Sequence, residues 1–383
     1  MMKNPIMKML ALGLLLISAG CGKNNSNESS KVQSTETQKE KEYWCEIYAN
    51  PVNVVSLSGA YYRGEVADPS IVKGDDGYFY MVGSNQVFLR SEDACNWEVV
   101  SEKIINLPSW GRQYNSGSYG VWAPDLIKIG DQWIYYYSLS GWGNPIGIGY
   151  ATADDIAGPY TDQGKLFTCE EIGIQNAIDP QPIIDEDGTV YLALGSFQGV
   201  YLVELTEDGT ECYGGIEYQN EEKILIAGRA GEFDYSTYEG SYIVKRGDYY
   251  YFFGSVGTCC VSKESTYKVH VGRSDNIAGP YRDKNKYSLT MAGSGKTYGE
   301  LVVWAGRSET ERDVIAPGHN SVLIDDAGDY WMYYHAYSSE DNYYTRHLFM
   351  DKIQWDEDGF PYIETKKPSF QEVLDGPRFI IEG

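Results

Sequence analysis

Four short segments of the chain carry ionisable residues in similar surroundings. Asp68 and Asp179 each precede a proline, in Ala67-Asp68-Pro69-Ser70 and Ile178-Asp179-Pro180-Gln181. Glu239 and His319 stand in Tyr238-Glu239-Gly240-Ser241 and Gly318-His319-Asn320-Ser321. Carboxyl groups that crowd together titrate apart, so that one is ionised while another keeps its proton. If the fold brings these four residues into one site, that site is suited to acid–base chemistry.

Each of these segments also has a simpler interpretation. An aspartate before a proline often only begins a strand or caps a turn. A histidine in a polar segment is as often a hydrogen-bonded structural residue as a functional one. The catalytic interpretation therefore depends on whether the four residues occupy equivalent places in a repeated structure.

A hairpin-like repeat occurs five times and supplies that structure. Each copy has a short apolar strand, a turn of acidic residues and glycine, and an aromatic strand, as in residues 70–80 and 322–331. Asp-Gly and Gly-Asp supply the positive φ that tight hairpin turns require. The turn glycines are Gly77, Gly130, Gly188, Gly247 and Gly328, at spacings of 53, 58, 59 and 81 residues.

These spacings leave room for about two more strands in each unit. Four-stranded units that repeat radially are the blades of a β-propeller. The sequence therefore predicts an all-β fold, a five-bladed β-propeller. A second similarity, between residues 153–160 and 274–281, also indicates duplicated blades. A β-sandwich is the alternative, but it does not explain five similar hairpins.

The ionisable residues hold nearly the same position in each repeat. Asp68, Asp179 and His319 lie nine residues before their turn glycines, and Glu239 lies eight before its own. In the second repeat Asp125 follows Ala123 by two residues and so shares its strand face. Because the first strand of each blade lines the central channel, we expect these side chains to converge on the axis.

The composition limits the ligand class. The formal net charge is −24, which disfavours nucleic acids and anionic membrane surfaces as partners. The chain is rich in flat side chains with a polar edge, with 34 Tyr and 9 Trp. Such residues suit both β-sheet packing and sugar binding. The charge fits a neutral or cationic ligand, and a solvated acidic surface alone also explains it.

The N-terminus has the pattern of an export signal. Lys3 and Lys8 precede a short apolar run, residues 9–17, and Ser18-Ala19-Gly20-Cys21 follows it. Residues 1–21 are therefore predicted to be a lipoprotein signal peptide that ends at a lipidated Cys21. Residues 22–42 are predicted to be a disordered tether, and residues 43–383 the propeller domain. The protein would be lipid-anchored to a bacterial membrane, on the periplasmic or cell-surface side. Cleavage without lipid attachment is the alternative.

Six cysteines follow Cys21. An exported protein permits disulfides, but the sequence shows neither their pairing nor whether they are buried free thiols. The six are Cys45, Cys95, Cys169, Cys212, Cys259 and Cys260.

Several motifs taken in order resemble glycoside hydrolase family 43, especially its endo-1,5-α-L-arabinanases. The resemblance extends from Tyr61 to Pro361. It is carried by Ala67-Asp68-Pro69-Ser70-Ile71, Val121-Trp122-Ala123-Pro124-Asp125, Asn176-Ala177-Ile178-Asp179-Pro180, Glu239-Gly240-Ser241-Tyr242-Ile243, Cys259-Cys260 with Ser265-Thr266-Tyr267, Val271-Gly272-Arg273-Ser274, Pro317-Gly318-His319-Asn320-Ser321 and Trp355-Asp356-Glu357-Asp358-Gly359.

The resemblance implies an inverting glycoside hydrolase of plant arabinan. Asp68 matches the general base and Glu239 the general acid. Asp179 matches the third carboxylate, which raises the pKa of the acid and orients it. His319 matches a histidine near a metal, usually calcium, in the central channel. Substrate contacts are expected from residues in the same motifs, namely Trp122, Asp125, Asn176 and Ser241. Trp142 and Tyr238 are further candidates for stacking on sugar rings, with core packing as the alternative; His335 is interpreted as a packing residue.

Two other functions remain open. An exo-acting α-L-arabinofuranosidase or β-xylosidase of the same family would carry the same three carboxylates. A non-catalytic glycan-binding surface lipoprotein is an alternative of another class. The expected partner in every case is a polysaccharide or oligosaccharide, with no nucleic acid, and the protein is expected to be a monomer.

Overall fold

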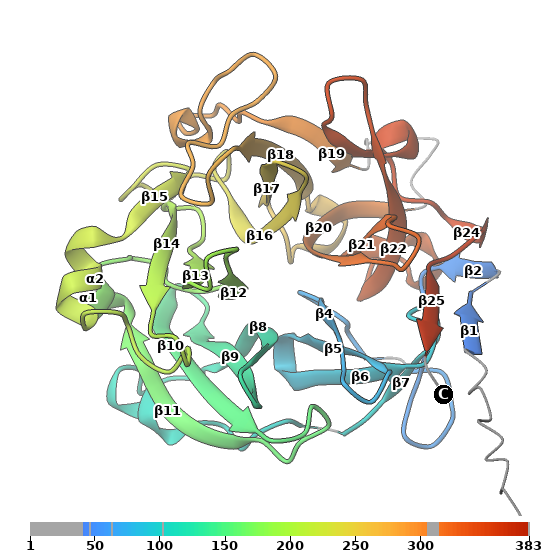
Figure 1. Ribbon diagram of the computed structural model, residues 1–383, viewed down its shortest axis with the longest axis horizontal. Helices are drawn as coiled ribbons and strands as arrows, with labels where there is room; N and C mark the ends of the chain where they lie inside the picture. The colour runs from blue at the N-terminus through green and yellow to red at the C-terminus, as the bar shows by residue number, and fades with distance from the viewer. Residues whose placement is uncertain (1–40, 46, 63, 102, 305–313, 382–383) are drawn as a thin grey trace, which may run out of the picture. The chain divides into compact units, whose positions relative to one another are not determined.

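The computed structural model describes residues 41–45, 47–62, 64–101, 103–304 and 314–381. The predicted signal peptide, the tether up to residue 40 and the lipidation site Cys21 lie outside these residues. Within them, antiparallel sheets are arranged as five blades around a central axis, which confirms the predicted five-bladed β-propeller (Figure 1). No helix in the described part of the chain is long and apolar enough to cross a bilayer.

Each blade contains four antiparallel strands that follow one another in the sequence. The blades are made of β4 (Ser70–Lys73), β5 (Phe79–Gly83), β6 (Val87–Ser91) and β7 (Trp97–Val99); β8 (Gly120–Ile129), β9 (Gln132–Gly141), β10 (Asn144–Ala153) and β11 (Thr161–Thr168); β12 (Gln181–Ile184), β13 (Val190–Leu194), β14 (Val200–Leu205) and β15 (Ile224–Ala227); β16 (Glu239–Arg246), β17 (Tyr249–Val256), β18 (Lys268–Ser274) and β19 (Glu300–Trp304); and β20 (Val314–Ile324), β21 (Tyr330–Ser338), β22 (Arg346–Trp355) and β23 (Pro361–Ile363).

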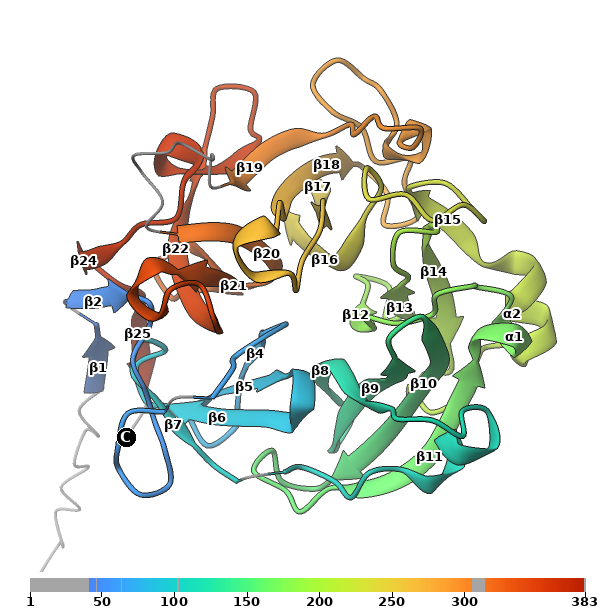
Figure 2. The same ribbon diagram turned by 180° about the vertical axis from the view of Figure 1, so that it is seen from behind.

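The first strand of each blade lies nearest the axis, as Figures 1 and 2 show. The predicted turn glycines join first and second strands, and all five have positive φ, between 58° and 89°. The similar segments 153–160 and 274–281 form the same turn in blades two and four. In it the Tyr160 and Tyr281 hydroxyls donate to the carbonyls of Ile156 and Ile277, at 2.8 and 2.7 Å.

The second strands are buried on both faces because neighbouring blades pack against each other. In β9, for example, every residue after Gln132 is buried. This explains the runs of tyrosine and other aromatic residues in these strands, since aromatic rings bury a large apolar area between sheets. The short helices α1 (Cys169–Ile172) and α2 (Ile216–Glu222) lie beside blade three.

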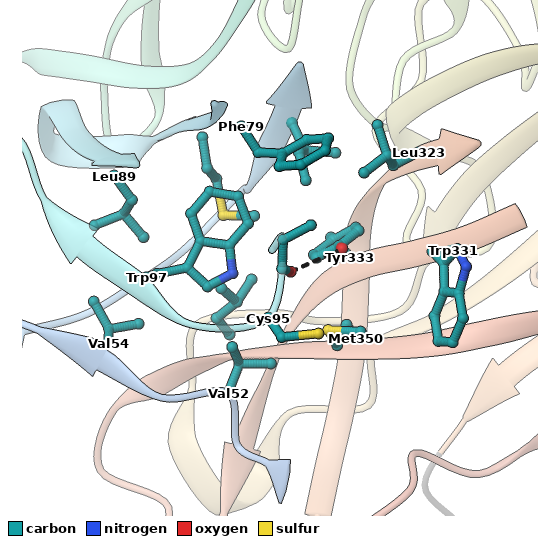
Figure 3. Packing of buried hydrophobic residues seen from close by; sticks show 14 of the residues in the cluster. Val52, Val54, Phe79, Leu89, Cys95, Trp97, Leu323, Trp331, Tyr333 and Met350 are labelled. Carbon is teal, nitrogen blue, oxygen red and sulfur yellow. Dashed lines mark hydrogen bonds between the residues drawn. The ribbon is translucent and has the colours of Figure 1, made fainter. Parts of the chain in front are cut away.

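Segments from both ends of the described chain close the ring between blades five and one. The pairs are β1 (Lys41–Trp44) with β25 (Arg378–Ile381), and β2 (Ile47–Asn50) with β24 (Gln371–Leu374); the short β3 (Val54–Val55) lies parallel to β7. Val52 donates its backbone N–H to the Leu348 carbonyl of β22 at 2.8 Å. Figure 3 shows the apolar cluster at this junction, in which the Tyr333 hydroxyl of blade five donates to the Ala94 carbonyl of blade one at 2.9 Å.

Candidate active site

One backbone position recurs in every blade, within the inner strand or just before it. The residues there have positive φ: 55° at Asp68, 35° at Ala123, 61° at Asp179, 53° at Gly240 and 50° at His319. Positive φ is uncommon for residues with a side chain and often marks functional sites. The repeat thus brings Asp68, Asp179 and His319 to equivalent places, as predicted.

Glu239 differs from the predicted register by one residue. In blade four the equivalent position is occupied by Gly240, and Glu239 precedes it. A side chain at position 240 is excluded, because a Cβ built there would lie 2.8 Å from the His319 ring. The Glu239 carboxyl therefore reaches the site from the position just before Gly240.

The second strands and the residues just after them supply a matching ring of polar side chains that the sequence analysis missed. The Ala123, Asp179 and His319 backbone N–H groups donate to the hydroxyls of Ser84, Ser138 and Ser255, at 2.8, 2.9 and 2.8 Å. Each hydroxyl comes from the preceding blade.

Two more residues complete this ring. In blade three Ser196 donates to the Glu239 carboxyl (Oε2) at 2.7 Å. In blade five His335 takes the place of a serine, and its Nδ1 accepts the Asp68 backbone N–H at 3.1 Å. The interpretation of His335 as a packing residue is therefore incomplete, although its ring also stacks on Tyr267. These five residues follow their turn glycines by seven or eight positions, a signal that was present in the sequence.

The Asp68 carboxylate lies among positive charges. Its Oδ1 lies 3.1 Å from Nδ1 of His319 and 3.8 Å from Nη1 of Arg346, and its Oδ2 accepts a hydrogen bond from Ser84. Burial raises the pKa of Asp68, but the charges of His319 and Arg346 outweigh it and hold the pKa well below the usual range. Asp68 is therefore ionised at neutral pH, as a general base must be.

Glu239 has the opposite preference. Burial and the nearby charge of Asp179 raise the pKa of Glu239 to about 8, and the hydrogen bond from Ser196 only partly offsets this. Burial also raises the pKa of Asp179, whose Oδ2 accepts the Gly240 backbone N–H at 3.1 Å. Glu239 therefore keeps a proton at neutral pH, as a general acid must, next to the carboxyl predicted to modulate it.

The three carboxyl groups line one cleft of about 260 Å³. Trp122 and Trp142 form part of its wall, with ring centroids 5.1 Å apart, and Trp142 is 77% exposed. Both tryptophans are therefore placed to contact a ligand, in agreement with the expectation for Trp122. Tyr238 is not, because it is fully buried and donates to the Tyr298 carbonyl at 2.8 Å.

The other expected substrate residues lie elsewhere. Asp125 and Ser241 line a separate small cavity in the channel, not the cleft. Asp125 accepts a hydrogen bond from Ser70 at 2.5 Å, and burial raises its pKa to about 7. Asn176 donates its side-chain amide to the Ser196 carbonyl at 3.0 Å, so it supports the segment that carries Ser196.

The small cavity in the central channel has some features of a calcium site. Its volume is about 20 Å³, and its lining includes the buried Ser241 and Ser321 hydroxyls and the Asn320 amide, which have no hydrogen-bond partner in the described structure. These oxygens suit calcium, which prefers oxygen ligands. Among the described residues, however, no group of three or more His, Cys, Asp and Glu side chains is placed to hold a metal.

His319 meets only part of the requirements for a metal ligand. It lines the same cavity. Burial lowers its pKa, but the charges of Asp68 and Asp179 outweigh burial and raise the pKa to about 9. Its cationic form pairs with Asp68, and only the neutral form can bind a cation.

One wall of the cleft contains a disulfide whose pairing the sequence could not predict. Cys259 and Cys260 form a disulfide between adjacent residues and line the cleft. The remaining described cysteines, Cys45, Cys95, Cys169 and Cys212, are free thiols. Arg346 lies between this disulfide and the base: its Nη1 is 3.4 Å from Cys260 Sγ and its Nε donates to Glu65 at 2.7 Å. Arg346 is on a third strand, where the inner-strand register gives no signal.

This arrangement can hydrolyse an acetal. One ionised and one protonated carboxyl group face the same cleft, so one can take a proton from water while the other gives a proton to a leaving oxygen.

Comparisons with known proteins agree with this chemistry. Residues 61–361 match the family model described as glycosyl hydrolases family 43. The extracellular exo-α-(1→5)-L-arabinofuranosidase of Cellvibrio japonicus is 31% identical over 79% of this chain and 87% of its own length. The extracellular endo-α-(1→5)-L-arabinanase 1 of Bacillus subtilis is 30% identical over 75% of this chain and 84% of its own.

Solved structures show the same fold. The α-L-arabinanase of Cellvibrio cellulosa in complex with arabinohexaose superposes with a TM-score of 0.69 at 28% identity, over 80% of this chain and 97% of that one. An exo-1,5-α-L-arabinanase from a bovine ruminal metagenomic library gives a TM-score of 0.65 at 30% identity, over 78% and 96% of the two chains.

Proposed function

The chain belongs to glycoside hydrolase family 43. We propose that it cleaves internal bonds of α-1,5-linked L-arabinan, with inversion at the anomeric carbon. The observation that carries this proposal is the convergence of Asp68, Asp179 and Glu239 on one cleft with opposite protonation of base and acid. The names of similar enzymes support arabinan as the substrate, but they include both endo- and exo-acting proteins.

The proposed reaction uses these side chains as follows. The Asp68 carboxylate takes a proton from a water molecule as the water oxygen attacks the anomeric carbon of an arabinofuranosyl unit. The bond from that carbon to the leaving oxygen breaks, and Glu239 transfers its proton to the leaving oxygen. Asp179 favours the protonated form of Glu239 before the reaction. The products are two shorter oligosaccharides, each with one new hydroxyl group. Both carboxyl groups then recover their starting protonation states by proton exchange with solvent.

The shape of the cleft supports endo action. Glu65 and Asn85 line both the catalytic cleft and an adjoining hollow of about 250 Å³. An adjoining hollow offers room for further sugar units, whereas an exo-acting enzyme needs one end of the cleft closed.

Product analysis on linear arabinan tests the proposal. We expect arabino-oligosaccharides of several lengths at early times, with the new reducing ends in the inverted anomeric configuration by proton NMR. Arabinose alone would indicate exo action, and release of xylose from xylosides without action on arabinan would contradict the assignment. Asp351→Asn serves as a control throughout, because Asp351 is a buried aspartate outside the cleft whose carboxyl accepts from Tyr334 at 2.5 Å.

We also propose that calcium binds in the central channel next to His319, through the channel oxygens described above. When bound, calcium supplies a fixed positive charge beside the carboxyl groups. Binding to the folded state alone stabilises it by about 2.7 kcal/mol at a calcium concentration 100 times Kd.

Chelation measures this effect. We expect EDTA to lower the melting temperature by a few degrees and calcium, but not magnesium, to restore it. In Asp125→Asn the shift should be smaller because the cavity loses a carboxylate. A melting temperature that does not respond to EDTA or calcium would contradict a bound ion.

Finally, we propose export with a lipid anchor at Cys21. Several similar proteins are named extracellular, and the Ser18-Ala19-Gly20-Cys21 motif supports lipidation. Mass spectrometry of the mature N-terminus tests it: a diacylglyceryl adduct on Cys21 is expected, and an unmodified N-terminus would contradict it.

A further inference from the structure

A cluster of three aromatic rings, two of them exposed, lies beside the cleft. Phe197, Phe233 and Tyr235 pack edge to face, with ring centroids 5.4, 5.1 and 4.9 Å apart. Phe197 is buried at 4% exposure, whereas Phe233 and Tyr235 are 54% and 49% exposed. We call these three residues the aromatic platform. Exposed apolar patches of this kind usually mark binding sites.

The platform adjoins the general acid. Phe197 directly follows Ser196, whose hydroxyl donates to the Glu239 carboxyl at 2.7 Å. The Phe197 backbone N–H donates at 2.9 Å to the carbonyl of Tyr238, the residue before Glu239. Phe233 and Tyr235 lie in residues 228–238, which connect β15 to Glu239 at the start of β16. Both segments lie at the end of the blades where the catalytic carboxyl groups stand.

Hydrogen bonds order the backbone that carries the two exposed rings. The Asp234 backbone N–H donates to the Phe197 carbonyl at 3.0 Å, and the Gly257 N–H donates to the Tyr235 carbonyl at 2.8 Å. The Asp234 carboxylate accepts from the Ser236 N–H at 2.8 Å. A surface ordered before binding loses less conformational entropy when a ligand arrives.

The platform is also continuous with the wall of the cleft. Phe197 packs in one apolar cluster with Tyr267, and Cys259 packs against that cluster. Tyr267 and Cys259 both line the cleft. Buried apolar packing therefore connects two residues that line the cleft to the ring on which Phe233 and Tyr235 rest.

We propose that the aromatic platform binds the pentose units on the leaving-group side of the bond that is cleaved. This inference rests on the proposed function, because a general acid stands next to the leaving oxygen and the sugars beyond that oxygen must pass beside Glu239. The C–H faces of furanose rings stack on Phe233 and Tyr235, and the tyrosine edge offers a hydroxyl for hydrogen bonding.

Kinetics on arabino-oligosaccharides of increasing length test the platform. For the wild type we expect kcat/KM to rise from arabinotriose to arabinohexaose. Phe233→Ala and Tyr235→Ala should each lower kcat/KM on the hexaose by roughly three- to tenfold, and the double variant should flatten the dependence on length. Tyr213→Ala is the matched control, because Tyr213 is 52% exposed and forms a similar edge-to-face pair with Tyr218 on blade three; it should behave as the wild type.

Calorimetric binding of arabinohexaose to Glu239→Gln separates the two proposals. We expect binding that weakens by a similar factor when Phe233 and Tyr235 are replaced in the same background. Unchanged binding, or an equal loss on short and long substrates, would overturn the platform and leave the arabinan assignment standing. A Glu239→Gln protein that binds no arabino-oligosaccharide would overturn the arabinan assignment and, with it, the ligand of the platform.

Discussion

Replacing Asp68 by asparagine will lower kcat for arabinan hydrolysis by about 10²–10⁴-fold, the usual contribution of a general base. The amide keeps the shape of the side chain but cannot take a proton from water. The loss should be similar for good and poor leaving groups, because water activation is required whatever group departs. Initial rates on linear arabinan and on aryl arabinofuranosides measure it.

Two controls separate lost chemistry from lost structure. Asparagine removes a charge that His319 and Arg346 face, so the melting temperature will fall, and rates must be taken well below it. Asp351→Asn also replaces a buried carboxyl and should retain the wild-type kcat/KM. A small nucleophilic anion such as azide, which needs no deprotonation, should restore part of the rate in Asp68→Asn. Full activity without azide would exclude Asp68 as the base.

The repeat made both the fold and the placement of Asp68 predictable. Five turn glycines specify five hairpins, and the inner-strand register then places Asp68, Asp179 and His319 at one backbone position. That inference needs only local turn chemistry and the two-residue period of strands. It placed Glu239 one residue away from the equivalent position, which Gly240 occupies and where a side chain would clash with the His319 ring.

Residues outside the inner strands were harder to predict. Ser84, Ser138, Ser196, Ser255 and His335 recur in the repeat, but a serine or histidine at the end of a buried strand has no distinctive pattern until the blades are placed side by side. Arg346 reaches the cleft from the third strand of blade five, and the Cys259–Cys260 disulfide reaches it from a loop. Contacts across blades depend on the closed ring, which local sequence does not specify.

Glu239→Gln, unlike Asp68→Asn, will lose activity mainly on substrates with poor leaving groups. On arabinan the leaving oxygen is a sugar alkoxide and needs a proton, so kcat/KM should fall by about 10²–10⁴-fold. On a dinitrophenyl arabinofuranoside the leaving phenolate is stable without a proton, so the loss should be much smaller. Comparison of the two substrates for both variants assigns the acid and the base independently. Equal losses on both substrates would contradict the role of Glu239 as the acid.

The pH dependence of kcat/KM gives the same assignment in the unmodified protein. A general acid must be protonated, so activity should fall as pH rises through the Glu239 pKa of about 8. The base limb should lie at very acidic pH, because the pKa of Asp68 is held well below its usual range. The Asp179→Asn variant tests the cause of this raised pKa.

Burial and the charge of Asp179 both raise the pKa of Glu239. Asp179→Asn removes the second cause and should move the alkaline limb to lower pH. An unmoved limb would mean that burial alone keeps the proton on Glu239. Asp179 would then act only by positioning Gly240, whose N–H its carboxylate accepts.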